Sequence, residues 1–598
     1  MNGPGLFERV NVPAVRERLR RSRGLERVGL AVVTLVTLAL LVVMFFYPVG
    51  VVFAESLVVD GRPTVAVITA ILTDEFFFGV FATALSDPWV LVESFPDYRL
   101  GLFGFTAYQA LLSTVASVAL GVPGAWVLAR WEFPGRQTVG SLTILPFVMP
   151  SIMVAIGFVA TFGENGVVNG FLRTLGLPTL ELLYTLEVIV LAHAFYNAPL
   201  VARVTAAAWE GVSADATETA RTLGASPLRA FRDVTLPQLL PAVLTGALLT
   251  FIFSFMSFAI VLALGGLRYA TVEVWVYHSV QQLDYGTATG LAVLEIVVSL
   301  SLTYAYLQYE ARQRASRTGR PAPRRDLLGG LTADRVAVGA YAAVAVLVFV
   351  LPMASMVLAS VTGPDGVTLR NYAFLVERQA EAYDFQVKPL TAVRNSLVFG
   401  AGTLVVAVPI GVLLGVVSTR RFRGRKVLDA LAMAPFAVSG IVVGLGLLRG
   451  LVFGFEAFGW RVTVAGPVAI VAAHAVGAYP FVTRNVAPAL AGIDDALVES
   501  ARVLGATRTR ALLDVELPLV VPGIVAGMAF AFAISIGEFD STVILATGTN
   551  SYTMPVAIER FLGRRLGPAT AMGSVLLVVT GASFVVIDRL GGRRGFDG

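Results

Sequence analysis

The sequence predicts an all-α integral membrane protein with about 12 transmembrane helices, arranged as two parallel six-helix repeats. Three observations lead to this fold class. The chain is 56% hydrophobic and 14% charged, with a mean hydropathy of +0.77, whereas soluble domains carry roughly 25% charged residues. Apolar runs long enough to cross a bilayer recur along its whole length. A stretch of the first half also recurs in the second half at a constant spacing.

Twelve apolar runs each supply the roughly 20 residues that a helix needs to cross the hydrocarbon core. The first run is longer than the hydrophobic region of a signal peptide, and no small-residue cleavage site follows it, so we interpret it as a span. The expected spans are 28–53, 104–129, 139–162, 183–207, 241–266, 285–308, 334–360, 393–418, 428–453, 464–488, 521–547 and 566–588.

If the chain crosses the membrane an even number of times, both termini lie on the same side. The basic residues gather in segments on that side. The positive-inside rule then predicts a multi-pass protein of the plasma membrane with both termini in the cytoplasm. The acidic segments 54–102 and 361–392 are expected outside. One loop, 548–565, is an exception, because it carries three arginines on the expected outer side. The basic segments on the expected inner side are 1–27, 130–136, 312–325, 420–426 and 589–594.

The internal repeat is clearest between residues 192–258 and 473–539, which align without gaps at an offset of 281. His193 falls on His474 and Glu218 on Glu499. Because each half has six spans, both halves share one orientation, and a solute is expected to pass between them. The expected division is an N-terminal cytoplasmic segment 1–27, a first domain 28–309, a cytoplasmic linker 310–333, a second domain 334–590 and a cytoplasmic tail 591–598.

The composition excludes several kinds of function. The absence of cysteine excludes disulfide frameworks, thiolate metal sites and cysteine nucleophiles. Only three histidines occur, which disfavours a histidine-rich metal site, so neither a metal nor a cofactor is expected. The net charge of +5 is spread over short loops between apolar runs, and this pattern indicates membrane topology rather than nucleic-acid binding.

A helix-turn-helix is expected after the fourth span. Ser213 is a good N-cap for its first helix, and Gly224 stands where a left-handed residue would end that helix. Ser226 offers a second cap, followed by a proline at the first helical position. The second helix is expected to end near Val234, stopped by Pro237.

The same signals recur in the second half, with Asp494 and Thr507 in the cap positions. The structural alternative is that each segment is simply a well-ordered re-entry loop. Duplication at matching positions instead indicates a docking surface that is used twice. The spacing of three between Glu218 and Arg221 stabilises a helix by only a few tenths of a kcal/mol, too little to explain why both positions recur.

These two segments, ETARTLGASPLRAFRDVTLP and ESARVLGATRTRALLDVELP, resemble the "EAA" loop of permeases from binding-protein-dependent ABC importers. Thr219 and Ser500 replace the second alanine of that motif, which is a conservative departure. The resemblance implies coupling loops at 210–240 and 491–521 that dock on two cytoplasmic ABC ATPase subunits, together with an extracytoplasmic solute-binding protein. The ATPase-coupling residues that it implies are Glu218, Ala220, Gly224, Leu236, Pro237, Glu499, Ala501, Gly505, Leu517 and Pro518.

The chain itself is not expected to be an enzyme. It has no G-x-x-x-x-G-K-[ST] loop, and neither Lys388 nor Lys426 has the glycines that cradle a phosphate. ATP hydrolysis is therefore assigned to separate partner subunits, and no catalytic residue is expected.

Ionisable residues inside spans cost roughly 2.5–3.5 kcal/mol on insertion scales and are functional candidates. Glu538 and Asp540 stand in the expected span 521–547, and the repeat places Ser257 opposite Glu538. These three residues are the substrate-path candidates. Because a spacing of two separates side chains on a helix, one acid is expected to line the path and the other to meet the outer surface. The alternative is that Glu538 only makes an interhelical hydrogen bond.

Four further polar residues are expected to be structural. Glu187 and Glu295 are buried-acid candidates that we assign to structural pairs rather than to ligand binding. His193 and His474 occupy equivalent positions near the middle of two spans. We assign them to hydrogen bonds between helices rather than to a metal.

Short stretches bear on the transported solute. SFAIVLALGG, ATVEVWVYHSV and AISIGEF, together with the fused two-domain form, resemble the thiamine transport permeases. Ferric iron or another small solute is the alternative. Ferric-iron permeases more often carry an acidic Asp-Phe-Gly element where this chain has Met256-Ser257-Phe258-Ala259. An ion-gradient-driven secondary transporter is the alternative from another class, with Glu538 and Asp540 as its proton sites, although such a carrier has no need of paired loops.

Overall fold

The computed structural model describes residue 29 and residues 32–591 apart from 60, 85–86, 88, 91–98, 144–145, 147–148, 313–322, 331, 364–365, 382–385, 421 and 458. In this part of the chain, eleven helices are long and apolar enough to cross a membrane. A pair bent by 96°, Arg425–Ala437 with Gly440–Val452, supplies a twelfth. This agrees with the expected all-α fold. The expected segment 1–27, the middle of the linker and residues 592–598 lie outside the described residues.

The first half begins with a long span, Val32–Leu57, and ends with α18. Its elements are η1 (Val42–Phe46), α2 (Tyr47–Leu57), α3 (Ala66–Leu72), α4 (Glu75–Phe78), α5 (Val80–Ala84), α7 (Gly101–Arg130), α8 (Arg136–Leu142), α10 (Ser151–Phe162), α11 (Val167–Thr174), α12 (Leu186–Glu210), α13 (Ala214–Thr222), α14 (Pro227–Ala230), η2 (Phe231–Thr235), α15 (Leu236–Phe255), α16 (Ala259–Gly265), α17 (Val272–Gln281) and α18 (Tyr285–Arg312).

The second half repeats this order from α19 to α31. Its elements are α19 (Ala333–Ala345), η3 (Val346–Val350), α20 (Leu351–Ser360), α21 (Arg370–Glu381), α22 (Pro389–Thr419), α23 (Arg425–Met433), η4 (Ala434–Ala437), α24 (Gly440–Leu447), η5 (Leu448–Val452), α25 (Gly466–Ala491), α26 (Asp495–Val503), α27 (Arg508–Ala511), η6 (Leu512–Glu516), α28 (Leu517–Gly537), α29 (Asp540–Leu545), η7 (Thr549–Ser551), α30 (Met554–Leu562) and α31 (Leu566–Gly591).

Strands are confined to four two-stranded pieces in the described chain. Three are antiparallel hairpins, and the fourth, β3 with β4, is parallel and joins the end of α7 to the linker. An ion pair between Arg324 and Glu210, at 2.8 Å, holds the same part of the linker. The strands are β1 (Val58–Val59) with β2 (Arg62–Pro63), β3 (Trp131–Glu132) with β4 (Arg325–Asp326), β5 (Thr362–Gly363) with β6 (Gly366–Val367), and β7 (Phe455–Ala457) with β8 (Trp460–Val462).

The spans are rich in Ala, Leu and Val. They are helical because a chain in hydrocarbon must satisfy its backbone hydrogen bonds within each segment. In each half, three helices form the centre: α7, α12 and α15 in the first, and α22, α25 and α28 in the second. The corresponding glycines Gly121 and Gly411 lie where α7 meets α12 and where α22 meets α25. A Cβ atom there would come within 2.7 Å and 2.8 Å of the carbonyl oxygens of Ala198 and Tyr479. Small residues therefore set the helix spacing.

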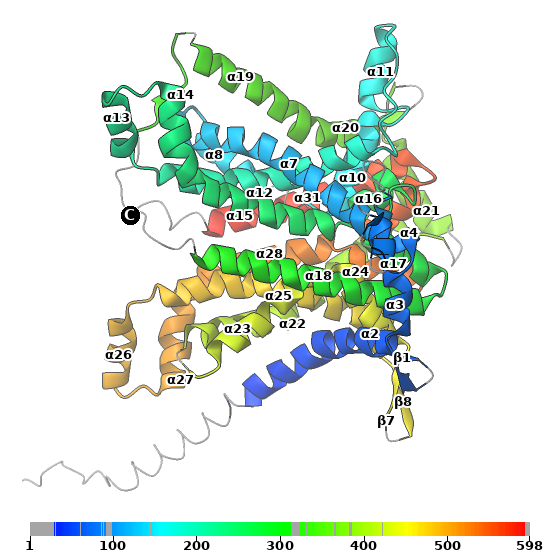
Figure 1. Ribbon diagram of the computed structural model, residues 1–598. Helices are drawn as coiled ribbons and strands as arrows, with labels where there is room; N and C mark the ends of the chain where they lie inside the picture. The colour runs from blue at the N-terminus through cyan, green and yellow to red at the C-terminus, as the bar shows by residue number, and fades with distance from the viewer. Residues whose placement is uncertain are drawn as a thin grey trace, which may run out of the picture.

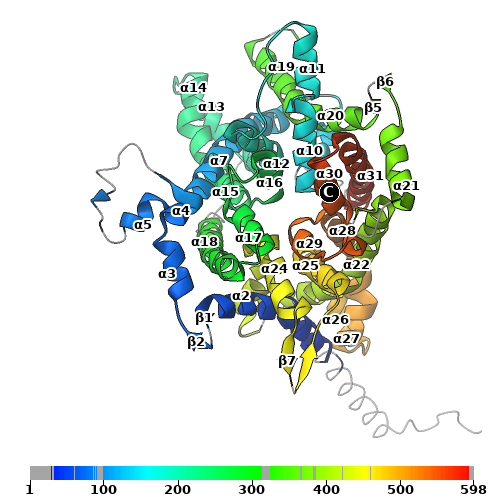
Figure 2. The ribbon, with the colours of Figure 1, turned by 90° about the vertical axis from the view of Figure 1, so that its right-hand side faces the viewer.

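The first span of each half packs on the other half. Helix α2 lies beside α24, and α20 lies beside α10 (Figure 2). Tyr47 donates a hydrogen bond to the carbonyl oxygen of Gly450 at 3.2 Å, and Arg449 forms an ion pair with Glu55 at 2.8 Å. The two halves are therefore joined by exchanged helices as well as by their central faces.

Four expected spans are broken rather than continuous. One is the expected span 428–453, which forms the pair of helices bent by 96°. The expected span 139–162 divides into α8 and α10 around Pro146 and Pro150. The spans 241–266 and 521–547 end at Phe255 and Gly537 and resume as the short helices α16 and α29. Glu538 therefore lies in extended backbone between two helices, not inside one apolar helix as expected.

The arginine-rich loop 548–565 contains a packed helix, α30, whose inner face is buried. Arg560 pairs with Glu559 at 3.3 Å, and Arg565 lies over the ring of Phe374 at 4.9 Å from its centre. These contacts account for two of the three arginines that disagree with the basic-inside pattern.

Candidate coupling loops and substrate pathway

The two helix-turn-helix segments lie at the same end of the molecule. Figure 1 shows α13 with α14 and α26 with α27 at its left end, opposite α11 and the β7–β8 hairpin. The repeat therefore produces two separate projections that face the same side of the membrane.

The local sequence signals fold as expected in both copies. The Ser213 side chain accepts a hydrogen bond from the Ala216 amide at 3.3 Å, and Asp494 accepts one from the Ala496 amide at 2.9 Å. Gly224 and Gly505 end their helices with φ of 92° and 96°, a left-handed conformation that glycine adopts without a steric penalty. Ser226 and Thr507 cap the second helices.

The helix end expected at Pro237 is wrong. The chain stays helical from Pro227 to Phe255, and the corresponding stretch from Arg508 to Gly537 behaves in the same way. A π-helical turn precedes the proline in each half, η2 in the first and η6 in the second. In η2, the amide of Leu236 donates a hydrogen bond to the carbonyl oxygen of Phe231, five residues back. This wider turn leaves room for a proline ring and needs no donor from it, so the helix continues.

Several side chains of these loops are exposed in the part of the chain that the structure describes. Glu218 and Glu499 are exposed, and neither forms an ion pair there with the arginine three residues later. Leu223 and Leu504 expose 83% and 88% of their surface. Exposed leucines and carboxylates at the tips of capped helices form a surface that another protein can cover.

Two electrostatic contacts stiffen the second helix of the first loop. Arg232 donates a hydrogen bond to Asp233 at 2.7 Å, and Arg229 pairs with Asp233 at 3.6 Å. The hydrogen bond from Arg232 lowers the pKa of Asp233 below its ordinary value. Arg510 and Asp514 repeat the second contact in the other loop, also at 3.6 Å.

The halves meet on the repeat axis at a pair of phenylalanines. Phe258 and Phe539 are repeat partners, and their rings stack with centres 5.6 Å apart and planes 14° apart. Both side chains are almost completely buried. Their neighbours in sequence, Ser257 and Glu538, are therefore brought to the junction between the halves, as the substrate-path prediction requires.

Each of these two candidates lies against the histidine of its own repeat. His193 bonds to Ser257 at 2.8 Å and to Ser113 at 2.9 Å, which joins α12 to the break between α15 and α16 and to α7. His474 lies 3.1 Å from Glu538 and bonds to Ser535 at 2.8 Å. The expectation of interhelical hydrogen bonds for both histidines agrees with this geometry.

Glu538 is held by several donors. Its carboxylate accepts the Ser541 amide at 2.8 Å and the Thr542 amide at 3.2 Å, so it caps the short helix α29. The hydroxyl of Thr542 donates to it as well. Because its carboxylate already has hydrogen-bond donors within the protein, this geometry agrees with the alternative in which Glu538 has a structural role.

Asp540 is partly buried at the start of α29, beside Gly440, and its Oδ1 atom lacks a hydrogen-bond partner among the described residues. Glu187 departs from expectation, because it is exposed in the first turn of α12 rather than buried.

Sequence reasoning missed Glu273. It lies between two expected spans, yet it is fully buried near the start of α17, next to Glu295 of α18. The signal that identifies it is a break in the repeat: the second residue of α17 is Glu273, whereas the second residue of α30 is Pro555.

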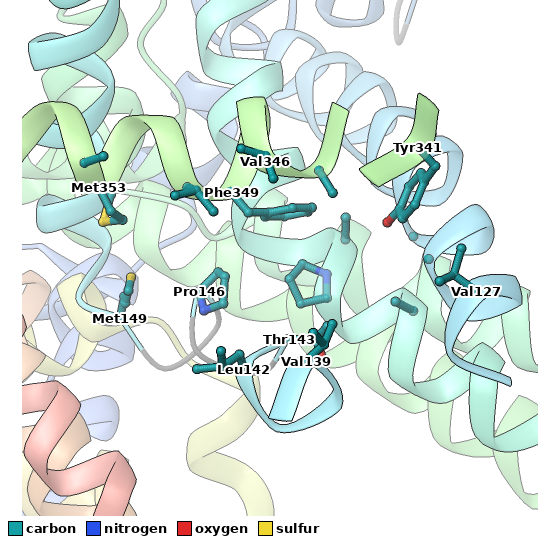
Figure 3. A pocket seen from close by; sticks show the side chains of 18 of the residues that line it. Val127, Val139, Leu142, Thr143, Pro146, Met149, Tyr341, Val346, Phe349 and Met353 are labelled. Carbon is teal, nitrogen blue, oxygen red and sulfur yellow. The ribbon is translucent and has the colours of Figure 1, made fainter. Parts of the chain in front are cut away.

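A groove of about 900 Å³ lies between α19 to α20 and the helices α7, α8 and α12 (Figure 3). Among its described lining residues, only Thr143 and Tyr341 have polar side chains. Phe349 and Met353 form part of its wall. Such an apolar lining suits hydrocarbon rather than a charged or polar solute, so the groove is not a candidate for the solute path.

One comparison decides the family. The sequence profile of the family described as "Binding-protein-dependent transport system inner membrane component" matches residues 121–315 and again 407–594, which together exceed half of the chain. The chain belongs to this family of permeases. Because one match falls in each half, the permease is the fused two-domain form that the internal repeat predicts.

Relatives of similar length carry thiamine permease names. The permease is 28% identical over 518 residues to the thiamine transport system permease protein ThiP of Brucella abortus (strain 2308), covering 84% of this chain and 89% of that protein. It is 28% identical over 536 residues to ThiP of Escherichia coli (strain K12), covering 87% and 94%. The resemblance to thiamine transport permeases is thus confirmed across most of the chain.

A half-length relative is the sulfate transport system permease protein CysT of Salmonella typhimurium, 32% identical over 34% of this chain and 76% of that protein. A solved bacterial alginate ABC transporter chain, crystallised in complex with an alginate pentasaccharide-bound periplasmic protein, covers 43% of this chain and 93% of its own length. It is 20% identical, with a TM-score of 0.36.

Proposed function

We propose that this permease carries thiamine from an extracytoplasmic binding protein into the cytoplasm, driven by two ABC ATPase subunits. The observation that supports the ATP-driven mechanism best is the pair of exposed loops at 210–240 and 491–521, whose helices are capped at corresponding positions. The thiamine permease names of the full-length relatives support the choice of solute.

In this proposal, the exposed loop residues contact the ATPases, and ATP is hydrolysed on those separate subunits. The residues in the contact would be Glu218, Ala220, Gly224, Leu236, Pro237 and their repeat partners. The solute would pass at the junction between the halves, near Ser257, Glu538 and Asp540.

Uptake into proteoliposomes tests the solute and the energy source. The permease would be reconstituted with its ATPase and binding protein, and ATP would be supplied on the loop side. We expect radiolabelled thiamine to accumulate only with ATP. Accumulation of ferric iron instead would assign the solute to the alternative, and thiamine uptake driven by a proton gradient without the ATPase would contradict the proposal.

The proposed orientation places both loops and both termini in the cytoplasm. Because the chain has no cysteine, single cysteines can be introduced without a background. In intact cells, a membrane-impermeant maleimide should label Leu177→Cys, next to α11, and leave Leu223→Cys unlabelled until the membrane is opened. The reverse pattern would invert the orientation.

A further inference from the structure

Two carboxyl groups lie buried against each other beside the junction between the halves. Glu273 of α17 and Glu295 of α18 are 0% and 1% exposed, and their carboxyl groups are close enough to interact. The Ser439 side chain, at the start of α24 in the other half, lies next to both. The pair thus belongs to the first half but borders the second.

This pair lacks the partners that buried acids normally have. At hydrogen-bonding geometry, neither carboxylate oxygen of Glu273 has a partner among the described residues, nor has Oε2 of Glu295. No ion pair in that part of the chain joins either acid to an arginine, lysine or histidine. Two adjacent buried carboxylates cannot both stay charged without compensation, so the site holds either a shared proton or a cation.

A third acid adds to this negative site from the other half. Asp540 of α29 interacts electrostatically with Glu273, and its Oδ1 atom also lacks a hydrogen-bond partner in the described chain. The carboxylate of Glu538, two residues earlier, instead accepts hydrogen bonds and lies next to His474. Acids from both halves therefore lie within electrostatic range of one another at the junction.

The fold does not require acids at these positions. Counted from the start of each helix, Glu273 corresponds to Pro555 of α30, and Glu295 corresponds to Leu576 of α31. Both counterparts are buried and apolar. Since the second half fills the same places in the scaffold with apolar side chains, packing alone does not explain the two carboxyl groups.

Aromatic rings lie on the same side of α17. Tyr277 follows Glu273 by one helical turn, and its ring contacts Phe258 with centres 5.3 Å apart. Phe258 in turn stacks on Phe539 from the other half. Carboxylates beside aromatic faces are the combination that recognises an organic cation, through charge and cation–π attraction.

We propose that Glu273, Glu295 and Asp540 form an organic-cation subsite, which the transported solute occupies when the halves separate at the Phe258–Phe539 stack. This inference rests on the proposed function, since it assigns the positively charged ring of thiamine to these acids. In the closed arrangement, a shared proton occupies the pair, and the cation replaces it on opening.

The test compares isosteric and charge-conserving variants in proteoliposomes that contain the whole transporter. Glu273→Gln keeps the shape and removes the charge, whereas Glu273→Asp keeps the charge and shortens the side chain. We expect the KM for thiamine uptake to rise at least tenfold in Glu273→Gln and in Glu295→Gln. It should stay within about threefold in Glu273→Asp. Glu187→Gln, in an exposed first helical turn, is the matched control and should leave the KM unchanged.

Two outcomes for the variants would contradict the subsite. An unchanged KM in both Gln variants would mean that the pair only shares a structural proton. An equal or larger loss in Glu273→Asp than in Glu273→Gln would indicate a packing role. If the unaltered transporter hydrolyses ATP but takes up no thiamine, the proposed solute fails instead, and that outcome is distinct because it does not depend on any variant.

Discussion

At the scale of single residues, glycines set how closely the central helices approach. Gly121 and Gly411 occupy corresponding places in α7 and α22, each against the backbone of the neighbouring helix. The sequence predicts the capping glycines Gly224 and Gly505, because a helix end leaves a local signature. It does not predict the packing glycines, because their constraint comes from a partner helix about 70 residues further along the chain.

Replacing Gly411 should therefore destabilise the permease. In Gly411→Val, the new Cβ would come within 2.8 Å of the Tyr479 carbonyl oxygen, and overpacking of this kind costs about 1–3 kcal/mol. Thermal unfolding in lipid nanodiscs should show a lowered midpoint. The matched control is Gly477→Val, because a Cβ at Gly477 meets nothing within 4 Å. Equal midpoints for both variants would contradict the packing account.

The buried acids are the part of the candidate site that the sequence predicted least well. Glu538 and Asp540 stand out because they interrupt an apolar run, and the structure does place them at the junction between the halves. Glu273 does not stand out, because it follows an arginine and a tyrosine in what reads as a loop. The break in the repeat marks the position as unusual, and the packing of α17 into the interior shows that the side chain is buried.

At the scale of elements, the coupling loops are defined by caps and by the π turn that follows. The caps follow from local sequence, because a side chain reaches an amide two or three residues later. The π turn does not, because proline is normally a reason to end a helix. The Leu-Pro pair recurs in both halves, and this repetition could have indicated a continuous helix. If each proline had ended a helix, both loops would have been separated from the membrane spans that follow them.

Removing a cap should loosen one loop without affecting the rest of the protein. Asp494→Ala removes the acceptor for the Ala496 amide and should cost about 1 kcal/mol, so amides in α26 should exchange with solvent roughly fivefold faster. Hydrogen–deuterium exchange measures this directly. Asp495→Ala, in the first turn but with no capping bond, is the control. Equal protection in both variants would show that the cap does not stabilise the helix.

At the scale of the whole molecule, two repeats are joined by exchange of their first spans. The sequence predicts twelve spans and two parallel halves, because hydropathy and internal similarity both act along the chain. It cannot show that α2 packs on α24 and α20 on α10, because no local pattern encodes which half a span contacts.

The ion pair between Glu55 and Arg449 tests this exchange. Its side chains are 28% and 26% exposed, so breaking it leaves a half-buried charge. Arg449→Met and Glu55→Gln should each lower the unfolding midpoint, whereas the double variant should recover part of the loss. A double-mutant cycle measures the coupling. Strictly additive effects would mean that the two side chains do not interact across the halves.

The central claim is that the chain presents two equivalent docking loops, each for one ATPase subunit. Native mass spectrometry of the solubilised complex measures this most directly. We expect two ATPase copies per permease chain, one copy when Leu504→Glu places a charge on the second loop, and still two for Leu328→Glu, an exposed leucine of the linker. A permease that purifies without ATPase, or that keeps two copies in Leu504→Glu, would contradict the account.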